Sequence, residues 1–254
     1  MQFVLVLAVL GSLVIADSVP NEPVSGAASR LVIVAAGVAL VALLAFAVSG
    51  WVAGRVRRRP SAEDVLLPRY RIWRRLHAAI WLTVAGASLY GLGWVQVVRF
   101  NWCLDRAVLL DELLILAPLL TPLVLSWAAH YEVDRAVRRG QTAEDASDSG
   151  LSTRWQYVGL HLRHYLGILL LPVLGLLAVQ DVAELLVPGI LQTGWALAVY
   201  LPPVVLVFVL FPWLLRRVWR TWPLEPGPLR GRLEAAAGRA GFRASEILVW
   251  HTGG

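Results

Sequence analysis

The sequence has no lysine, one cysteine and few charges of either sign. Charged residues make up 16% of its 254 positions, whereas a soluble domain carries about 25%. So few polar side chains could not cover the surface of an ordinary soluble enzyme, and the apolar content excludes a disordered chain. The single cysteine, Cys103, excludes an intramolecular disulfide and a cysteine-based metal cluster.

Apolar residues are abundant instead, at 58% of the chain, and they gather in long runs. A helix needs about 20 such residues to cross the hydrocarbon layer. The sequence therefore predicts an all-α polytopic membrane protein with six transmembrane helices within residues 1–220. We place these spans at 2–16, 31–53, 77–98, 109–127, 157–180 and 193–215.

The first run is short and has two interpretations. It is either a retained helix or a cleaved signal peptide, with Val14 and Ala16 placed like a small-residue cleavage site. No basic residue precedes the run, which favours the retained helix.

All 23 basic residues are arginine, and their distribution predicts the orientation. Only Arg30, Arg99 and Arg106 fall on one side of the predicted spans. Sixteen fall on the other side: Arg55, Arg57, Arg58, Arg59, Arg69, Arg71, Arg74, Arg75, Arg135, Arg138, Arg139, Arg154, Arg163, Arg216, Arg217 and Arg220. Because arginine gathers on the cytoplasmic side, both termini are predicted in the cytoplasm, in a bacterial inner membrane. The net charge of +6 is then an orientation signal, and no nucleic-acid partner is expected.

Two connections are long enough to have structure of their own. Residues 60–75 predict an amphipathic helix on the inner surface, whose apolar side chains face lipid. These side chains are Tyr70, Ile72, Trp73 and Leu76. Residues 140–152 are small, acidic and polar, which predicts a flexible loop.

Motifs that carry chemistry are absent from the sequence: it has no HExxH, P-loop, GxGxxG or GxSxG. His161 and His164 share a helical face, but Arg163 between them disfavours a bound metal, so they are predicted as interfacial histidines. The segment His130-Tyr131-Glu132 is typical of a helix end.

Four acidic residues lie near the predicted outer ends of spans: Asp111, Glu112, Asp181 and Glu184. They either mark a proton or ion path or are solvated helix termini, and the second interpretation is favoured, because charges at the ends of a span cost far less than charges at its middle. Prolines within the apolar runs predict kinks in a packed bundle rather than the broken helices of transporters. They are Pro118, Pro122, Pro172, Pro202 and Pro203.

The last 34 residues, 221–254, change character. Residues 229–240 predict an amphipathic helix capped by Gly241, residues 244–250 predict a strand, and residues 251–254 predict a turn. A lone strand leaves its peptide groups unpaired. Either the strand pairs with another chain, or its domain continues beyond the sequence, and we favour the second.

This tail resembles the opening of the peptidase domain in HtpX-like and CAAX-prenyl-protease-like membrane zinc endopeptidases. The resemblance rests on residues 224–230, 233–234, 240–243 and 246–254, which include the segment Glu246-Ile247-Leu248-Val249-Trp250. It implies a cytoplasmic α+β domain after the membrane helices, zinc in the full-length parent, and membrane or membrane-proximal proteins as substrates. The zinc ligands of the family are absent from these residues, so no catalytic, cofactor-binding or metal residue is assigned and the chain alone is expected to be inactive. The alternative is a non-enzymatic membrane protein, such as a transporter subunit or scaffold, whose partner is the lipid bilayer.

Overall fold

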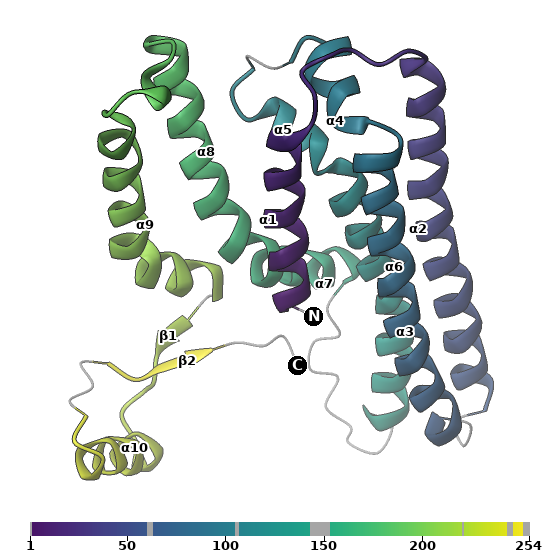
Figure 1. Cartoon of the computed structure of the whole chain (residues 1–254). Helices are drawn as coiled ribbons and strands as arrows, with labels where there is room; N and C mark the ends of the chain where they lie inside the picture. Colours follow the sequence, from purple (N-terminus) through teal and green to yellow (C-terminus); the bar gives the residue numbers. More distant parts are fainter. Residues whose placement is uncertain are drawn as a thin grey trace.

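The computed structural model describes residues 2–59, 63–104, 107–142, 153–219, 221–242 and 246–250. The chain is mostly helical, with one two-stranded sheet (Figure 1). The predicted turn at residues 251–254, Arg106 and Arg220, and most of the predicted loop at 140–152 lie outside the described residues. In chain order the elements are α1 (Gln2–Ser18), α2 (Ala27–Arg58), α3 (Glu63–Gly86), η2 (Ala87–Gly91), α4 (Trp94–Gln96), η3 (Val97–Asn101), α5 (Leu110–Ile115), α6 (Ala117–Thr142), α7 (Arg154–His161), η4 (Leu162–Gly167), α8 (Ile168–Leu186), η5 (Ile190–Gln192), α9 (Ala196–Trp219), β1 (Thr221–Pro223), α10 (Pro228–Arg239) and β2 (Leu248–Trp250).

Three helices in the described part of the chain are long and apolar enough to cross a membrane, and a bent pair makes a fourth. The three are Ala27–Arg58, Arg154–Leu186 and Ala196–Val218, and the pair is Glu63–Gly91 with Trp94–Asn101, bent by 58°. This is the pattern of a membrane protein, with fewer clear spans than the six predicted. The first predicted span is a short apolar helix, Val4–Ser18. The fourth is divided between α5 and α6, and α6 continues through polar residues to Thr142.

Helices α2, α3 and α6 pack side by side and carry much of the core (Figure 1). The buried residues of α2 follow the helical period, and half of them are small: Ala42, Ala45, Ser49 and Ala53. Such a stripe lets another helix backbone approach closely. Helix α1 adds Leu5 and Val9 to the main core cluster.

Residues 63–75 of the predicted surface helix are instead the first part of α3, which runs on to Gly86, and residues 60–62 lie outside the described part of the chain. Ile72 and Leu76 are exposed, as predicted, but Tyr70 is buried. The prediction that Tyr70 faces lipid is wrong, because α3 lies against α2 and α6 along this segment and turns Tyr70 toward Ser49 and His130.

The helices from α7 to α9 form a hairpin. Helices α7, η4 and α8 run continuously from Arg154 to Leu186, and α9 packs back against α8. Pro122, Pro172, Pro202 and Pro203 all lie inside helices.

The tail departs from prediction at its strand. Helix α10 matches the predicted helix, and Gly241 follows it with a left-handed φ of 76°. The strand β2 is not alone, however, because it pairs antiparallel with β1, with Thr221 opposite Trp250 and Pro223 opposite Leu248. The expectation of an unpaired strand is therefore wrong, since sequence periodicity did not reveal the three-residue partner after α9. Figure 1 shows the tail at the same end of the molecule as the N-terminus.

Candidate functional site

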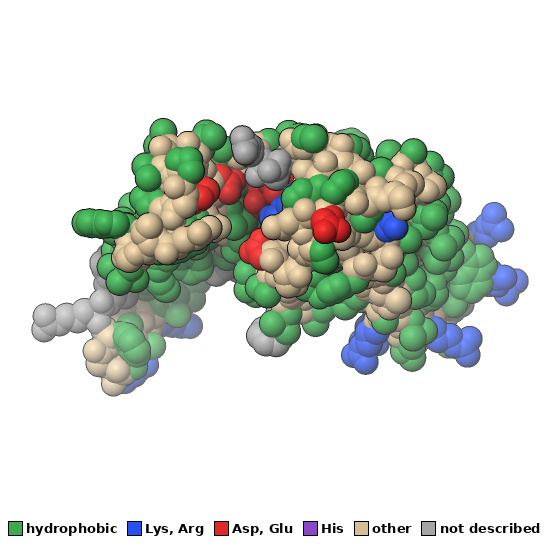
Figure 2. All heavy atoms as spheres, turned by 45° about the horizontal axis from the view of Figure 1, so that its top comes forward, with side chains coloured by type: hydrophobic (Ala, Val, Ile, Leu, Met, Phe, Trp, Pro, Cys, Tyr) green, Lys and Arg blue, Asp and Glu red, His purple; other side chains and the backbone are tan. Residues whose placement is uncertain are grey.

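A cavity of about 270 Å³ opens at the end of the molecule opposite the termini. Acidic side chains gather around a hollow in this face (Figure 2). Its walls come from α1, the loop after it, η3, α5 and α8. The lining residues are Leu13, Asp17, Asn21, Arg99, Phe100, Asp111, Glu112, Leu177, Gln180 and Asp181.

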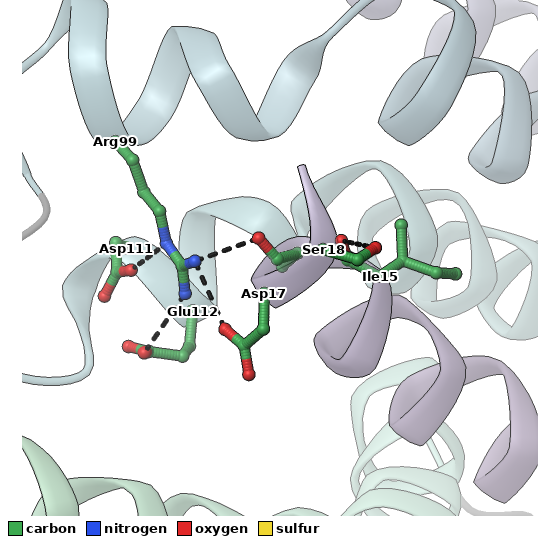
Figure 3. Close-up of polar contacts among 7 residues, drawn as sticks. Ile15, Asp17, Ser18, Arg99, Asp111 and Glu112 are labelled. Atoms are coloured by element: carbon green, nitrogen blue, oxygen red, sulfur yellow. Dashed lines mark hydrogen bonds and ion pairs between the residues drawn. The ribbon is translucent and has the colours of Figure 1, made fainter. Parts of the chain in front are cut away.

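Arg99 is the central cation of this cavity (Figure 3). Its Nε donates to Asp111 Oδ2 at 2.9 Å, and its Nη1 donates to the carbonyl oxygen of Ala16 at 3.0 Å and to Asp17 Oδ1 at 3.3 Å. Its Nη2 lies 4.0 Å from Glu112 Oε1, too far for a hydrogen bond. One guanidinium thus joins α1, η3 and α5.

Two of the carboxylates around Arg99 are not solvated helix termini. Asp111 and Glu112 are only 4% and 5% exposed. The sequence places them near the end of a span, but the fold buries them beside Arg99, so the favoured interpretation is wrong for these two residues. Of the four acids singled out in the sequence, the structure brings together Asp111, Glu112 and Asp181, while Glu184 caps the turn at Gly189, whose N–H it accepts at 2.6 Å.

Local backbone geometry positions these groups. Arg99 lies on the π-helical turn η3, a type of turn that is frequent at functional sites. Leu109, just before α5, has a φ of 62°, a left-handed conformation that is strained for a side chain of this size. Its N–H donates to Asp181 Oδ2 at 3.1 Å, which ties the start of α5 to α8.

A second polar cluster lies inside the bundle, nearer the other end. Ser49 of α2, Tyr70 of α3 and His130 of α6 form a triangle, with Tyr70 Oη 2.8 Å from His130 Nδ1 and 2.9 Å from Ser49 Oγ. His77 Nε2 hydrogen-bonds Ser126 Oγ at 2.9 Å. His77 and His130 meet edge to face and help to line a cavity of about 20 Å³, enough for about one water molecule.

The histidines singled out in the sequence lie in different surroundings. His130 is buried within α6 and is not at a helix end, so that prediction is wrong; α6 continues twelve residues further. The His161 ring stacks on Tyr165 and lies tilted against Tyr157, and its Nδ1 lies 2.9 Å from the carbonyl oxygen of Tyr157. These contacts place His161 in an aromatic setting.

Sequence reasoning missed Arg99, which had only been counted for orientation, and Asp17. The available signal was an arginine close before an Asp-Glu pair at the end of an apolar run, because a charge there needs a partner.

Comparison of the chain with protein-family models, curated proteins and solved structures finds no match.

Proposed function

We propose that this chain is the membrane-embedded N-terminal part of a zinc-dependent metalloendopeptidase similar to the HtpX-like and CAAX-prenyl-protease-like enzymes. The observation that carries the proposal is the unit β1–α10–β2, which follows α9 directly and contains the segments of the resemblance. A helix between two paired strands suits the opening of an α+β domain. The parent enzyme would cleave membrane or membrane-proximal proteins.

The residues in hand do not form the zinc site of such an enzyme. The family's HExxH motif places two histidines one helical turn apart, and no such pair occurs in the sequence. The proposal therefore assigns no step of hydrolysis to these residues, and it gives them the roles of anchor and domain opening.

Two measurements test the proposal. The genomic reading frame after the codon for Gly254 is expected to encode HExxH within about a hundred codons, a rough allowance for one domain. A frame without the motif contradicts the proposal. The 254-residue chain, purified in detergent, is expected to cleave no peptide substrate, and any peptidase activity of this chain would contradict the assignment of hydrolysis elsewhere.

The proposal includes six membrane passes with both termini in the cytoplasm of a bacterial inner membrane. The arginine distribution supports it, as does the position of the N-terminus and the tail at one end (Figure 1). Cys103 is exposed near the other end. A membrane-impermeant maleimide is therefore expected to label Cys103 in spheroplasts, and not a Val65→Cys variant that lacks Cys103. Labelling of residue 65 from outside contradicts this orientation.

The second candidate is a non-enzymatic membrane protein, a transporter subunit or scaffold. One observation favours it: the three buried apolar clusters among the described residues draw on nothing after Leu174, so the bundle packs without the tail. Limited proteolysis separates the two candidates. Early cleavage within residues 221–254 supports a domain opening that needs further chain, whereas a resistant tail supports the self-contained protein.

A further inference from the structure

We propose that the cavity around Arg99, called the outer cavity below, is a calcium-binding site. Asp111, Glu112 and Asp181 supply its carboxylate ligands. This site lies at the opposite end of the molecule from the proposed peptidase opening and does not depend on it.

The first observation is an imbalance of charge. Four carboxylates line the cavity, from Asp17, Asp111, Glu112 and Asp181, and Arg99 is the one cation among the lining residues. Arg99 hydrogen-bonds Asp111 and Asp17 and lies 4.0 Å from Glu112, so one positive charge faces four carboxylates. Asp111 and Glu112 are buried, and buried carboxylates without a full counter-charge are strongly unfavourable, so the cavity favours a further cation.

The second observation is an oxygen without a partner. Glu112 is 5% exposed, and its Oε2 has no hydrogen-bond partner although it is shielded from solvent. Its Oε1 is 4.0 Å from the nearest nitrogen of Arg99. Buried carboxylate oxygens are normally hydrogen-bonded or bound to a metal, and Glu112 borders the cavity where a metal ion would sit.

The ligand oxygens are close enough together for one ion. One oxygen from each of Asp111, Glu112 and Asp181 lies within 4.8 Å of the others. Calcium binds oxygen at about 2.3–2.6 Å, so two of its ligands can stand up to about 5 Å apart. Three carboxylates within this limit can therefore share one calcium ion.

The cavity can complete the coordination. Calcium takes six to eight oxygen ligands, including neutral carbonyl groups and water. The amides of Asn21 and Gln180 border the same space. Its volume of about 270 Å³ corresponds to roughly nine water molecules at about 30 Å³ each.

The test uses the full chain purified in detergent and equilibrium dialysis against radioactive CaCl₂. We expect one saturable site per chain. Glu112→Gln and Asp181→Asn are each expected to weaken binding at least about tenfold, because each removes a charged ligand. Glu184→Gln is the matched control: it removes an acid on the same helix as Asp181 that does not border the cavity, and it is expected to bind calcium as the parent chain does.

Several outcomes overturn the proposal. They are the absence of saturable binding, binding that both ligand variants retain, an equal loss in Glu184→Gln, and a tighter affinity for MgCl₂ than for CaCl₂. If Glu112→Gln does not yield folded protein by gel filtration, the half-buried Asp181→Asn variant decides the outcome alone.

Discussion

Two regions of the molecule are packed very differently. In the bundle of α2, α3 and α6, α2 has fully buried residues such as Val41 and Ala45. In the hairpin, the most apolar 18-residue stretch of α9 contains no buried residue, and Phe208 is 75% exposed. Half of the buried residues of α2 are alanine or serine, which let a neighbouring helix approach closely, whereas α9 carries mainly leucine, valine, phenylalanine and prolines. Hydropathy thus indicates which segments are apolar enough for a membrane, while the small residues of α2 favour its contacts with neighbouring helices.

The largest expected effect lies beside the bundle, where Arg99 joins α1 to α5. Replacing Arg99 by methionine removes the partner of the buried Asp111 carboxylate. The free energy of unfolding should fall by about 3–5 kcal/mol, because a buried charge is left uncompensated. Denaturant titration of the protein in detergent measures it. The double variant Arg99→Met/Asp111→Asn should recover part of the loss, and no recovery would show that the ion pair is not the cause.

The next comparison tests the packing difference directly. Leu119 of α6 is 1% exposed within the main core, so Leu119→Ala should lower the free energy of unfolding by about 2–5 kcal/mol. Phe208→Ala removes a larger side chain from exposed α9 and should change it by less than about 0.5 kcal/mol. Thermal unfolding in one detergent compares the two. Similar losses would mean that α9 is buried against a partner rather than exposed.

A smaller effect is expected in the polar triangle within the bundle. Tyr70→Phe keeps the ring but removes the hydroxyl that contacts Ser49 and His130. The expected loss of unfolding free energy is about 1 kcal/mol, typical of one buried hydrogen bond. Tyr90→Phe provides the control, since Tyr90 is exposed, and it should leave stability unchanged. Equal stability of both variants would contradict a contribution from the triangle.

The smallest effect concerns Glu132 of α6, whose ion pairs link the bundle to the hairpin. Its carboxylate pairs with Arg154 at the start of α7 and with Arg57 of α2 at 2.5 Å. These contacts, first the hydrogen bond to Arg154, hold the pKa of Glu132 below its ordinary 4.5. Because the pKa is lower in the folded state, the stabilisation is complete above about pH 4.5 and is lost as the pH falls through the lower folded value.

This pH dependence has a simple measurement. The midpoint of thermal unfolding should decrease as the pH falls below about 4.5, and Glu132→Gln should remove a small part of that decrease. A Glu132→Gln variant whose pH profile overlays that of the parent chain would rule out the contribution.

The sequence predicted where the helices lie better than it predicted which residues they contact. The run at 31–53 lies wholly inside α2, and 229–240 closely matches α10, because hydrophobic periodicity is a local property of the chain. Burial of Tyr70 depends on which face of α3 meets α2 and α6, and pairing of β2 depends on a strand 25 residues earlier. Neither is encoded in the segment itself.

Some of the residues of the outer cavity were identified from the sequence. Asp111, Glu112 and Asp181 were singled out, with an ion path as one of two interpretations. Their burial and their union with Arg99 arise from contacts such as Arg99 to Asp17, 82 positions apart, and Leu109 to Asp181, 72 positions apart. Local sequence patterns do not reveal contacts between residues so far apart in the chain. The helix-terminus interpretation was therefore favoured.

The join between α9 and β1 has a mechanical consequence. Only one residue separates Trp219, the last of α9, from Thr221, the first of β1. A helix turns by about 100° and rises about 1.5 Å per residue, so the direction in which the chain leaves α9 changes with each residue added to that helix. One alanine inserted within α9 should therefore turn the start of β1 by about 100° and shift it by about 1.5 Å, which spin labels at position 222 and on α10 would report as a changed distance to the bundle.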